Sequence, residues 1–333
     1  MRTLGLLILG ALLLQGCASS DKSSTQPDWV NGPSARYSDS QYLLGRGQAQ
    51  QREQASDRAR ADLAKAIEVQ VEEQSRDVTS ASSKTVQGES HQELSQEVSR
   101  NVSTHTDKLI RGAEVKDIWQ DPNSRAFNVL VVLDRLKTAH ALREDMQALD
   151  DTTRAAIGRA QESQDLLLRI GAAQQAIKAQ QERQALQRVL RVVDRGGQGL
   201  PPKWQLGQLE AERAGLLQSM TISVQSADGA ELAALAAGAL SEAGFKVNPD
   251  SGAEFVLQAD LQRTPVQRHE GWYWLRASLE VELRDATGQV RGTARWPLKA
   301  SAQNQALLDQ RLMGLAASAL KRELGPAIIG FAQ

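Results

Sequence analysis

A single cysteine, Cys17, is the feature that most restricts how this chain of 333 residues can be held together. With one thiol, no intramolecular disulfide can form, whatever the redox state of the compartment. The position of the thiol, close to the start of the chain, indicates a role in targeting rather than in a folded core.

The residues before this cysteine have the pattern of a secretory signal peptide. Met1-Arg2 supplies one positive charge, and the run from Leu4 to Leu14 is almost wholly apolar. The run is too short to span a bilayer, which takes about 20 apolar residues. A buried core helix is the alternative, but the run begins at Met1 and ends in a polar, Ser-rich stretch.

The four residues Leu14-Gln15-Gly16-Cys17 resemble a bacterial lipobox, although Gln15 stands where a small residue is usual. The resemblance implies cleavage after Gly16, with a diacylglycerol on the Cys17 sulfur and a third acyl chain on its amine. Each buried methylene adds about 0.8 kcal/mol, so three chains anchor durably. Ordinary secretion and a structural cysteine are the alternatives.

Ala18 follows the cysteine, where an aspartate would signal retention in the inner membrane of double-membraned bacteria. By resemblance to lipoprotein sorting, we expect a lipid anchor in the outer membrane that faces the periplasm. The acyl chains would then be the contact with the membrane.

Composition restricts the class of partner. The net charge is −1 and no basic block occurs, which argues against nucleic acid, because phosphate binding needs clustered Lys and Arg. No second apolar segment is long enough to span a membrane. The length suggests about two domains.

The pattern of apolar residues predicts an α+β protein: two small modules, each an antiparallel sheet backed by helices, joined by a long helical segment. The expected parts are a signal peptide (1–16), a lipidated flexible tether (17–27), an α+β domain (28–137), a helical connector (138–195), a linker (196–204) and a C-terminal β-α-β-β-β-α domain (205–333).

In the first domain, residues 42–50 predict a strand that ends in a glycine turn, followed by a helix from Ala55. Residues 75–93 are polar, and 94–109 predict a thinner helix. Asp121-Pro122-Asn123-Ser124 predicts the turn of a hairpin. Its second strand is expected to place one apolar set on one face: Phe127, Val129, Val131 and Leu133.

The connector contains a helical run from 152 to 194, which would span about 65 Å if unbroken. Asp150-Asp151-Thr152-Thr153 are expected to cap it. The apolar positions do not form clean heptads, which favours a spacer or a packed hairpin over a parallel coiled coil. The pattern leaves open whether the run is extended or folded back.

No motif predicts catalysis, a metal or a cofactor, so we expect a protein that is not an enzyme. Gly45 and Gly47 suggest a phosphate loop, but no third glycine or GK[ST] follows, and a strand-to-helix turn is the better interpretation. The carboxylate pairs Glu72-Glu73 and Asp150-Asp151 are expected on solvated surfaces or caps. The histidines have no metal-ligand spacing: His91, His105, His140 and His269.

The stretch 272–283 alternates strictly, and its outward face begins with Trp272 and Trp274, followed by Arg276. Paired tryptophans beside an arginine are typical of interaction hot spots, so these three residues are the predicted site for a protein partner. The alternative is that a loop or the interdomain helix covers them. Trp119 and Trp296 are expected in the core or at its rim.

Several motifs in order resemble the LPP-twenty lipoprotein family. They are Pro27-Asp28-Trp29-Val30, the stretch 42–50, the alanine-spaced helix 55–71 and the stretch 115–134. The match covers about residues 27–140, a third of the chain. The resemblance implies an envelope lipoprotein without catalysis, and some members of the family are linked to flagellar assembly or to the cell surface.

Two functional hypotheses remain. In one, the protein is a structural or assembly factor of the cell envelope, with Trp272 and Trp274 as a docking patch. In the other, it regulates or activates an enzyme of cell-wall synthesis. An extended helix would favour reach and hence the regulator, whereas a folded hairpin would favour the scaffold. The sequence names neither the envelope partner nor the oligomeric state.

Overall fold

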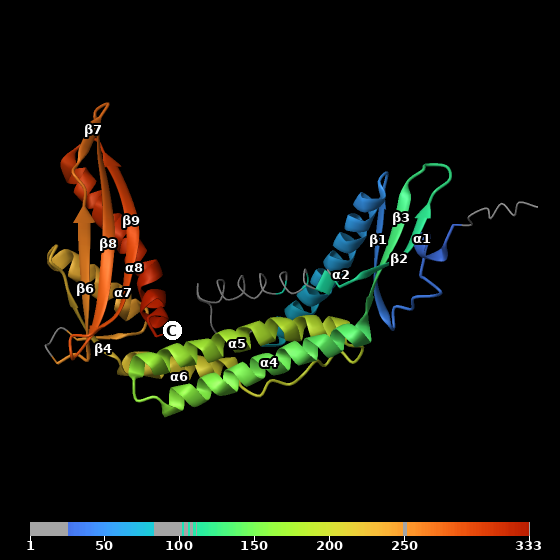
Figure 1. Ribbon diagram of the computed structural model, residues 1–333, viewed down its shortest axis with the longest axis horizontal. Coiled ribbons are helices and arrows are strands. Elements are labelled where there is room, and N and C mark those ends of the chain that lie inside the picture. Colours follow the sequence, from blue (N-terminus) through green and yellow to red (C-terminus); the bar gives the residue numbers. More distant parts are fainter. Residues whose placement is uncertain are drawn as a thin grey trace, which may run out of the picture. The chain divides into compact units, whose positions relative to one another are not determined.

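The computed structural model describes residues 26–82, 102, 106, 109–110, 112–248 and 252–332, with the backbone alone for 74–82. The fold is mixed α+β, as predicted (Figure 1). Contacts divide the chain into an N-terminal unit, residues 1–63 with 114–132, and a C-terminal unit, 64–113 with 133–333. Gly16, Cys17, Ala18 and most of the predicted helix 94–109 lie outside the described residues.

The N-terminal unit is built on a sheet of three strands in the order β1-β3-β2. Strands β2 and β3 pair antiparallel around the predicted turn at 121–124, which confirms the hairpin. The strands and their flanking helices are α1 (Asp28–Asn31), β1 (Tyr42–Ala49), α2 (Arg52–Ser82), β2 (Glu114–Gln120) and β3 (Phe127–Asp134).

The glycines of β1 lie inside the strand, so the predicted glycine turn is wrong. A Cβ on Gly45 would stand 2.1 Å from the carbonyl oxygen of Ala59, and one on Gly47 would stand 2.1 Å from that of Ala55. Both alanines are fully buried. Helix α2 therefore rests directly on the backbone of β1, which explains the glycines better than a phosphate loop does.

Strand β3 is buried on both faces, so the expectation of one apolar face is incomplete. Val129 and Val131 are fully buried on one face, and Leu130 is fully buried on the other. Leu130 packs with Trp29 of α1, while the alternate residues lie on the face of Gly45. The hairpin strand is thus the centre of a sheet that is covered on both sides.

Replacing Gly45 with alanine should lower the free energy of unfolding by about 1–3 kcal/mol, because a helix backbone occupies the space of the new methyl group. Urea denaturation measures the change. Gly158 is the matched control, since it lies inside the helix that spans residues 135–162 and a Cβ there meets nothing within 4 Å. Gly158→Ala should add about 0.5–1 kcal/mol. A Gly45→Ala variant as stable as wild type would contradict the close packing.

The connector is a helical hairpin rather than one long helix. Helix α4 (Arg135–Glu162) and helix α5 (Leu166–Val193) lie side by side within the C-terminal unit (Figure 1). The predicted run 152–194 breaks because Asp165 caps α5, accepting from the backbone N–H groups of Leu167 and Leu168 at 2.9 and 3.2 Å. Arg135 Nη1 donates to the carbonyl oxygen of Val192 at 2.8 Å, which links the start of α4 to the end of α5.

The predicted cap at 150–153 instead lies in the middle of α4, where Asp150 and Thr153 belong to a buried polar cluster. Asp150 is 0% exposed, and its Oδ1 lies 2.7 Å from Nε of Arg183, which is 2% exposed. Arg183 also donates from Nη2 to the carbonyl oxygen of Pro201 at 3.0 Å. Gln180 donates to the hydroxyl of Thr153 at 2.8 Å. The cluster joins both helices to the segment that follows them.

Breaking the Asp150–Arg183 pair should cost about 3–5 kcal/mol of unfolding free energy, because either single substitution removes the nearest ionic partner of a buried charge. Without Arg183, Asp150 keeps a longer contact with Lys203, whose Nζ lies 4.0 Å from Asp150 Oδ2. Arg183→Met is the single variant, and Asp150→Leu with Arg183→Met should recover most of the loss. A denaturation double-mutant cycle measures the coupling.

The adjacent carboxylate provides the control for that cycle. Asp151 is half exposed and pairs with Arg154 at 2.7 Å. Asp151→Ala should leave stability nearly unchanged, since exposed ion pairs contribute little. Equal effects at positions 150 and 151 would show that the buried pair has no special structural role.

The C-terminal unit contains a mixed sheet in the order β5-β4-β6-β8-β7, with β9 also on β8. Strand β4 pairs parallel with β5 and β6, so the expected antiparallel meander holds only for β6 to β9. The remaining elements are α6 (Leu206–Ser219), β4 (Thr221–Gln225), α7 (Ala230–Glu242), β5 (Lys246–Val247), β6 (Phe255–Arg263), β7 (Gln267–His269), β8 (Trp272–Asp285), β9 (Val290–Ala302) and α8 (Gln305–Gly330).

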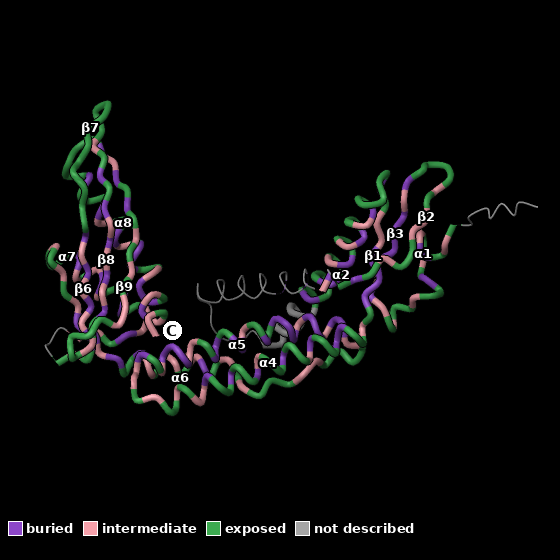
Figure 2. The backbone as a smooth tube through the Cα atoms, in the orientation of Figure 1, coloured by how far each residue is buried: buried purple, intermediate pink, exposed green. Residues whose placement is uncertain are grey.

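Helices α7 and α8 pack against one face of this sheet and against each other. The parallel pairing follows from α7, because it carries the chain from the end of β4 back over the sheet. In Figure 2 the tip around β7 is exposed, while buried positions recur along β8. The apolar core of this unit therefore lies between helices α7 and α8 and the face of the sheet that they cover.

Candidate functional site

The predicted partner site lies on the outer face of β8. Trp272 is 37% exposed and Trp274 is 49% exposed, whereas Leu275 and Leu279 on the opposite face are buried. Arg276 is also exposed. Among the described residues, both tryptophans keep part of their side-chain surface exposed.

A tight turn positions the two tryptophans. Glu270 and Gly271 both have positive φ, 49° and 79°, as a type I′ hairpin turn requires. The turn pairs His269 with Trp272 and Gln267 with Trp274. The site is therefore held by backbone pairing. We call residues 263–276 the tryptophan hairpin.

Basic side chains accompany the indoles. Arg276 stands opposite Lys299 of β9, and both are exposed. Arg268 is the register partner of Tyr273, and its guanidinium lies 5.4 Å from that ring centre, so it belongs to the opposite face of the hairpin. The surface thus combines exposed aromatic area with positive charge, which is the composition of many protein-binding hot spots.

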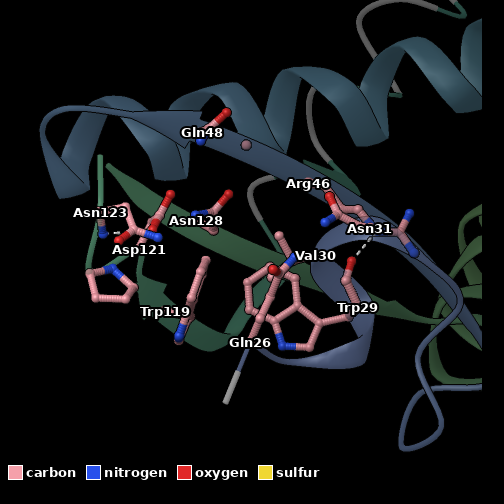
Figure 3. A pocket seen from close by; sticks show the side chains of 12 residues that line it. Gln26, Trp29, Val30, Asn31, Arg46, Gln48, Trp119, Asp121, Asn123 and Asn128 are labelled. Atoms are coloured by element: carbon pink, nitrogen blue, oxygen red, sulfur yellow. Dashed lines mark hydrogen bonds between the residues drawn. The ribbon is translucent and has the colours of Figure 1, made fainter. Parts of the chain in front are cut away.

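A second candidate site, absent from the sequence prediction, is a cavity of about 520 Å³ in the N-terminal unit. Trp119, expected in the core or at its rim, lines it, and so do residues of the predicted turn. We call it the N-terminal cavity (Figure 3). Its lining residues are Gln26, Trp29, Val30, Asn31, Arg46, Gly47, Gln48, Trp119, Asp121, Pro122, Asn123 and Asn128.

Helix α1 is fixed over the sheet by hydrogen bonds that shape this cavity. Arg46 donates from Nε to the carbonyl oxygen of Trp29 at 2.7 Å and from Nη2 to that of Gly32 at 3.0 Å. The indole N–H of Trp29 donates to Asp117 Oδ2 at 2.8 Å. These bonds anchor the short helix to β1 and to β2.

The hairpin turn supplies the acidic end of the cavity. Asp121 accepts from the backbone N–H of Asn123 at 2.9 Å and from the Ser124 hydroxyl at 2.7 Å. These bonds, the hydroxyl bond first, hold the pKa of Asp121 below its ordinary value of 3.8. Figure 3 shows Asp121 and Asn123 at one end and Arg46 and Asn31 at the other.

Two buried donors in the cavity wall lack an acceptor among the described residues. They are Nε1 of Trp119 and Nδ2 of Asn128. The two residues are register partners on β2 and β3, so their side chains share one face. Asn128 is 7% exposed. A polar residue within the apolar run of β3 was the one signal in the sequence for this site.

In the described parts of the chain, no three His, Cys, Asp or Glu side chains gather in a way that could hold a metal ion. Among the same residues, no helix has the length and apolar character needed to cross a bilayer.

Residues 27–134 match the family model of the LPP20 lipoprotein. The predicted resemblance over this segment is confirmed, and it indicates a lipoprotein of the cell envelope. The matched segment includes the whole cavity except Gln26, whereas the tryptophan hairpin lies outside it. No curated protein is similar enough to match the chain.

Three solved structures are similar to parts of the chain. A minor lipoprotein from Acinetobacter baumannii is 18% identical over 32% of this chain and 91% of its own, with a TM-score of 0.27. A secreted protein from Helicobacter pylori is 14% identical over 85% and 97%, with a TM-score of 0.46. A lipoprotein from Neisseria meningitidis is 18% identical over 32% and 98%, with a TM-score of 0.23.

Proposed function

We propose that this protein is a non-catalytic lipoprotein of the outer membrane, anchored through Cys17 and facing the periplasm. It serves as a structural or assembly factor, and it docks an envelope protein on the tryptophan hairpin. The observation that carries the proposal is the exposure of Trp272 and Trp274 on a strand whose other face is core.

The chemistry of the hairpin favours a protein surface that is apolar and acidic. Covering the indoles removes a large apolar area from water, and the arginine beside them can pair with a carboxylate. Because the hairpin is already ordered by backbone pairing, little conformational entropy is lost on binding. Arg276 and Lys299 select against a basic partner.

The helical hairpin favours the scaffold over the regulator. Each of α4 and α5 has 28 residues and spans about 42 Å, and the second helix returns along the first. An unbroken run would have reached about 65 Å. The helical hairpin of α4 and α5 is therefore a packed connector within the C-terminal unit and not a single extended helix.

Substituting both Trp272 and Trp274 with alanine should reduce capture of the envelope partner at least tenfold and leave the fold intact, because both side chains are exposed. In-cell crosslinking of the full-length lipoprotein followed by mass spectrometry measures capture. Val290→Ala with Leu315→Ala is the control, since these exposed apolar side chains lie outside the hairpin.

The identity of the captured protein decides between the two functions. Components of the flagellar base or of another outer-membrane assembly would support the scaffold, whereas a peptidoglycan synthase would support the regulator. Unfolding of the double variant would place the tryptophans in the core and contradict the docking site.

Replacing Cys17 with alanine should release the protein from the membrane fraction, because no thiol remains to carry the acyl chains. Ala18→Asp is the matched control and should stay membrane-bound but move to the inner membrane. Cell fractionation followed by immunoblotting measures both. A Cys17→Ala protein that remains in membranes would disprove the anchor.

A further inference from the structure

We propose that Arg58 and Asp62 of α2 lock the free edge of β1, which without them pairs antiparallel with the same edge of a second copy of this chain. The inference does not rest on the docking function, since the tryptophan hairpin lies in the other unit. It starts from the sheet order β1-β3-β2, in which β1 has a strand beside it on one side alone among the described strands.

Two side chains of α2 take the place of a neighbouring strand at this edge. The backbone N–H of Arg46 donates to Asp62 Oδ2 at 2.9 Å. Arg58 Nη1 donates to the carbonyl oxygen of Gln48 at 2.6 Å. In a strand, the N–H and C=O groups of every second residue point to the same edge. Since the groups at 46 and 48 bond to α2, they belong to the edge that faces away from β3, and the helix satisfies both.

The close packing of α2 on β1 brings these side chains within reach, and Figure 1 shows the helix running beside the strand. A Cβ on Gly45 would stand 2.1 Å from the carbonyl oxygen of Ala59, so the helix backbone lies directly on β1. Arg58 and Asp62 are four residues apart, which puts both on one side of the helix. Both are exposed, so neither belongs to the core.

The groups that the lock covers are complementary to themselves. In an antiparallel pair of β1 strands with Gly47 on the twofold axis, residue 46 of each copy lies opposite residue 48 of the other. The N–H of Arg46 then donates to the Gln48 carbonyl oxygen of the second copy, and the reverse bond also forms. A second copy therefore supplies the acceptor and the donor that Asp62 and Arg58 supply within one chain.

An edge strand with unpaired backbone groups is a template for pairing with another chain, and proteins block such edges with charged side chains. The C-terminal unit contains a similar contact on β6, beyond the residues that pair with β4. There the backbone N–H of Leu261 donates to Asp228 Oδ2 at 2.6 Å. A carboxylate thus covers an edge amide in both units, which supports a protective role for Asp62.

The test is sedimentation velocity of the detergent-solubilised full-length protein over a range of concentrations. Arg58→Ala with Asp62→Ala, the unlocked variant, should form a concentration-dependent dimer. Its association constant should exceed that of wild type by at least about tenfold, because backbone groups are freed to pair. Asp57→Ala with Arg60→Ala is the matched control, since these residues form an ion pair at 3.9 Å on the same helix. The control removes the same charges and should sediment as wild type does.

A proline at position 48 tests whether β1 is the interface. Proline has no N–H and is tolerated in an edge strand where that group would face solvent. Added to the unlocked variant, Gln48→Pro should restore the monomer, because residue 48 of each copy can no longer donate to Arg46 of the other. Its Tm should stay close to that of the unlocked variant.

The proposal is overturned if the unlocked variant keeps its Tm and remains monomeric, if the control pair dimerises equally or if Gln48→Pro leaves the dimer intact. It is also overturned if Gln48→Pro dissociates a dimer of the wild type, since the edge would then be open. Unfolding of the unlocked variant would contradict it too, because both side chains are assigned to the edge and not to the core. None of these variants alters the tryptophan hairpin, so failure here and failure of the docking function are distinguishable.

Discussion

The direct contact of helix α2 with the backbone of β1 is the constraint on which the N-terminal unit depends. Gly45 and Gly47 have no side chain, and carbonyl oxygens of the helix fill the space where a Cβ would be. At these two positions the helix therefore rests on the strand with no strand side chain between them. Because side chains alternate along a strand, Arg46 and Gln48 must project from the other face. That face is where the cavity forms, so two glycines on one side of β1 determine which residues line the site on the other.

The C-terminal unit is organised differently, with a buried ion pair at the centre of its helical hairpin. Asp150 and Arg183 are withdrawn from water, and the desolvation cost of burying two charges can exceed the attraction between them. The pair fixes how α4 and α5 are aligned along each other. Arg183 must lie opposite Asp150, and a second nitrogen of its guanidinium, Nη2, donates to the carbonyl oxygen of Pro201. One arginine thus fixes two helices and the start of the segment that leads to α6. A leucine in place of Arg183 would pack in the hairpin, but it would fix neither the alignment of the two helices nor the position of the segment that follows them.

The sequence allowed good predictions where a local pattern is repeated, and poor ones where the cause is a contact with a distant residue. The alternation of apolar residues along β8 correctly predicted which side chains point away from the core. The sequence from Asp121 to Ser124 correctly predicted a hairpin turn. Asp150 was misassigned as a cap because its partner lies more than thirty residues away. The cavity could not be predicted from a motif, since α1, β1 and the β2–β3 hairpin each supply a part. The one local sign of the cavity in the sequence was Asn128, a polar residue within an apolar strand.

The two candidate sites lie in different units and use tryptophan in opposite ways. In the cavity, Trp29 is buried and its N–H is committed to Asp117, so its indole is a fixed wall. On the hairpin, Trp272 and Trp274 stand in solvent and lose that exposure only when something covers them. The residues that line the cavity and those of the tryptophan hairpin are different, so substitutions at the two sites should act additively. The proposed docking surface and the cavity thus lie in separate units, so each can be altered without changing the residues of the other.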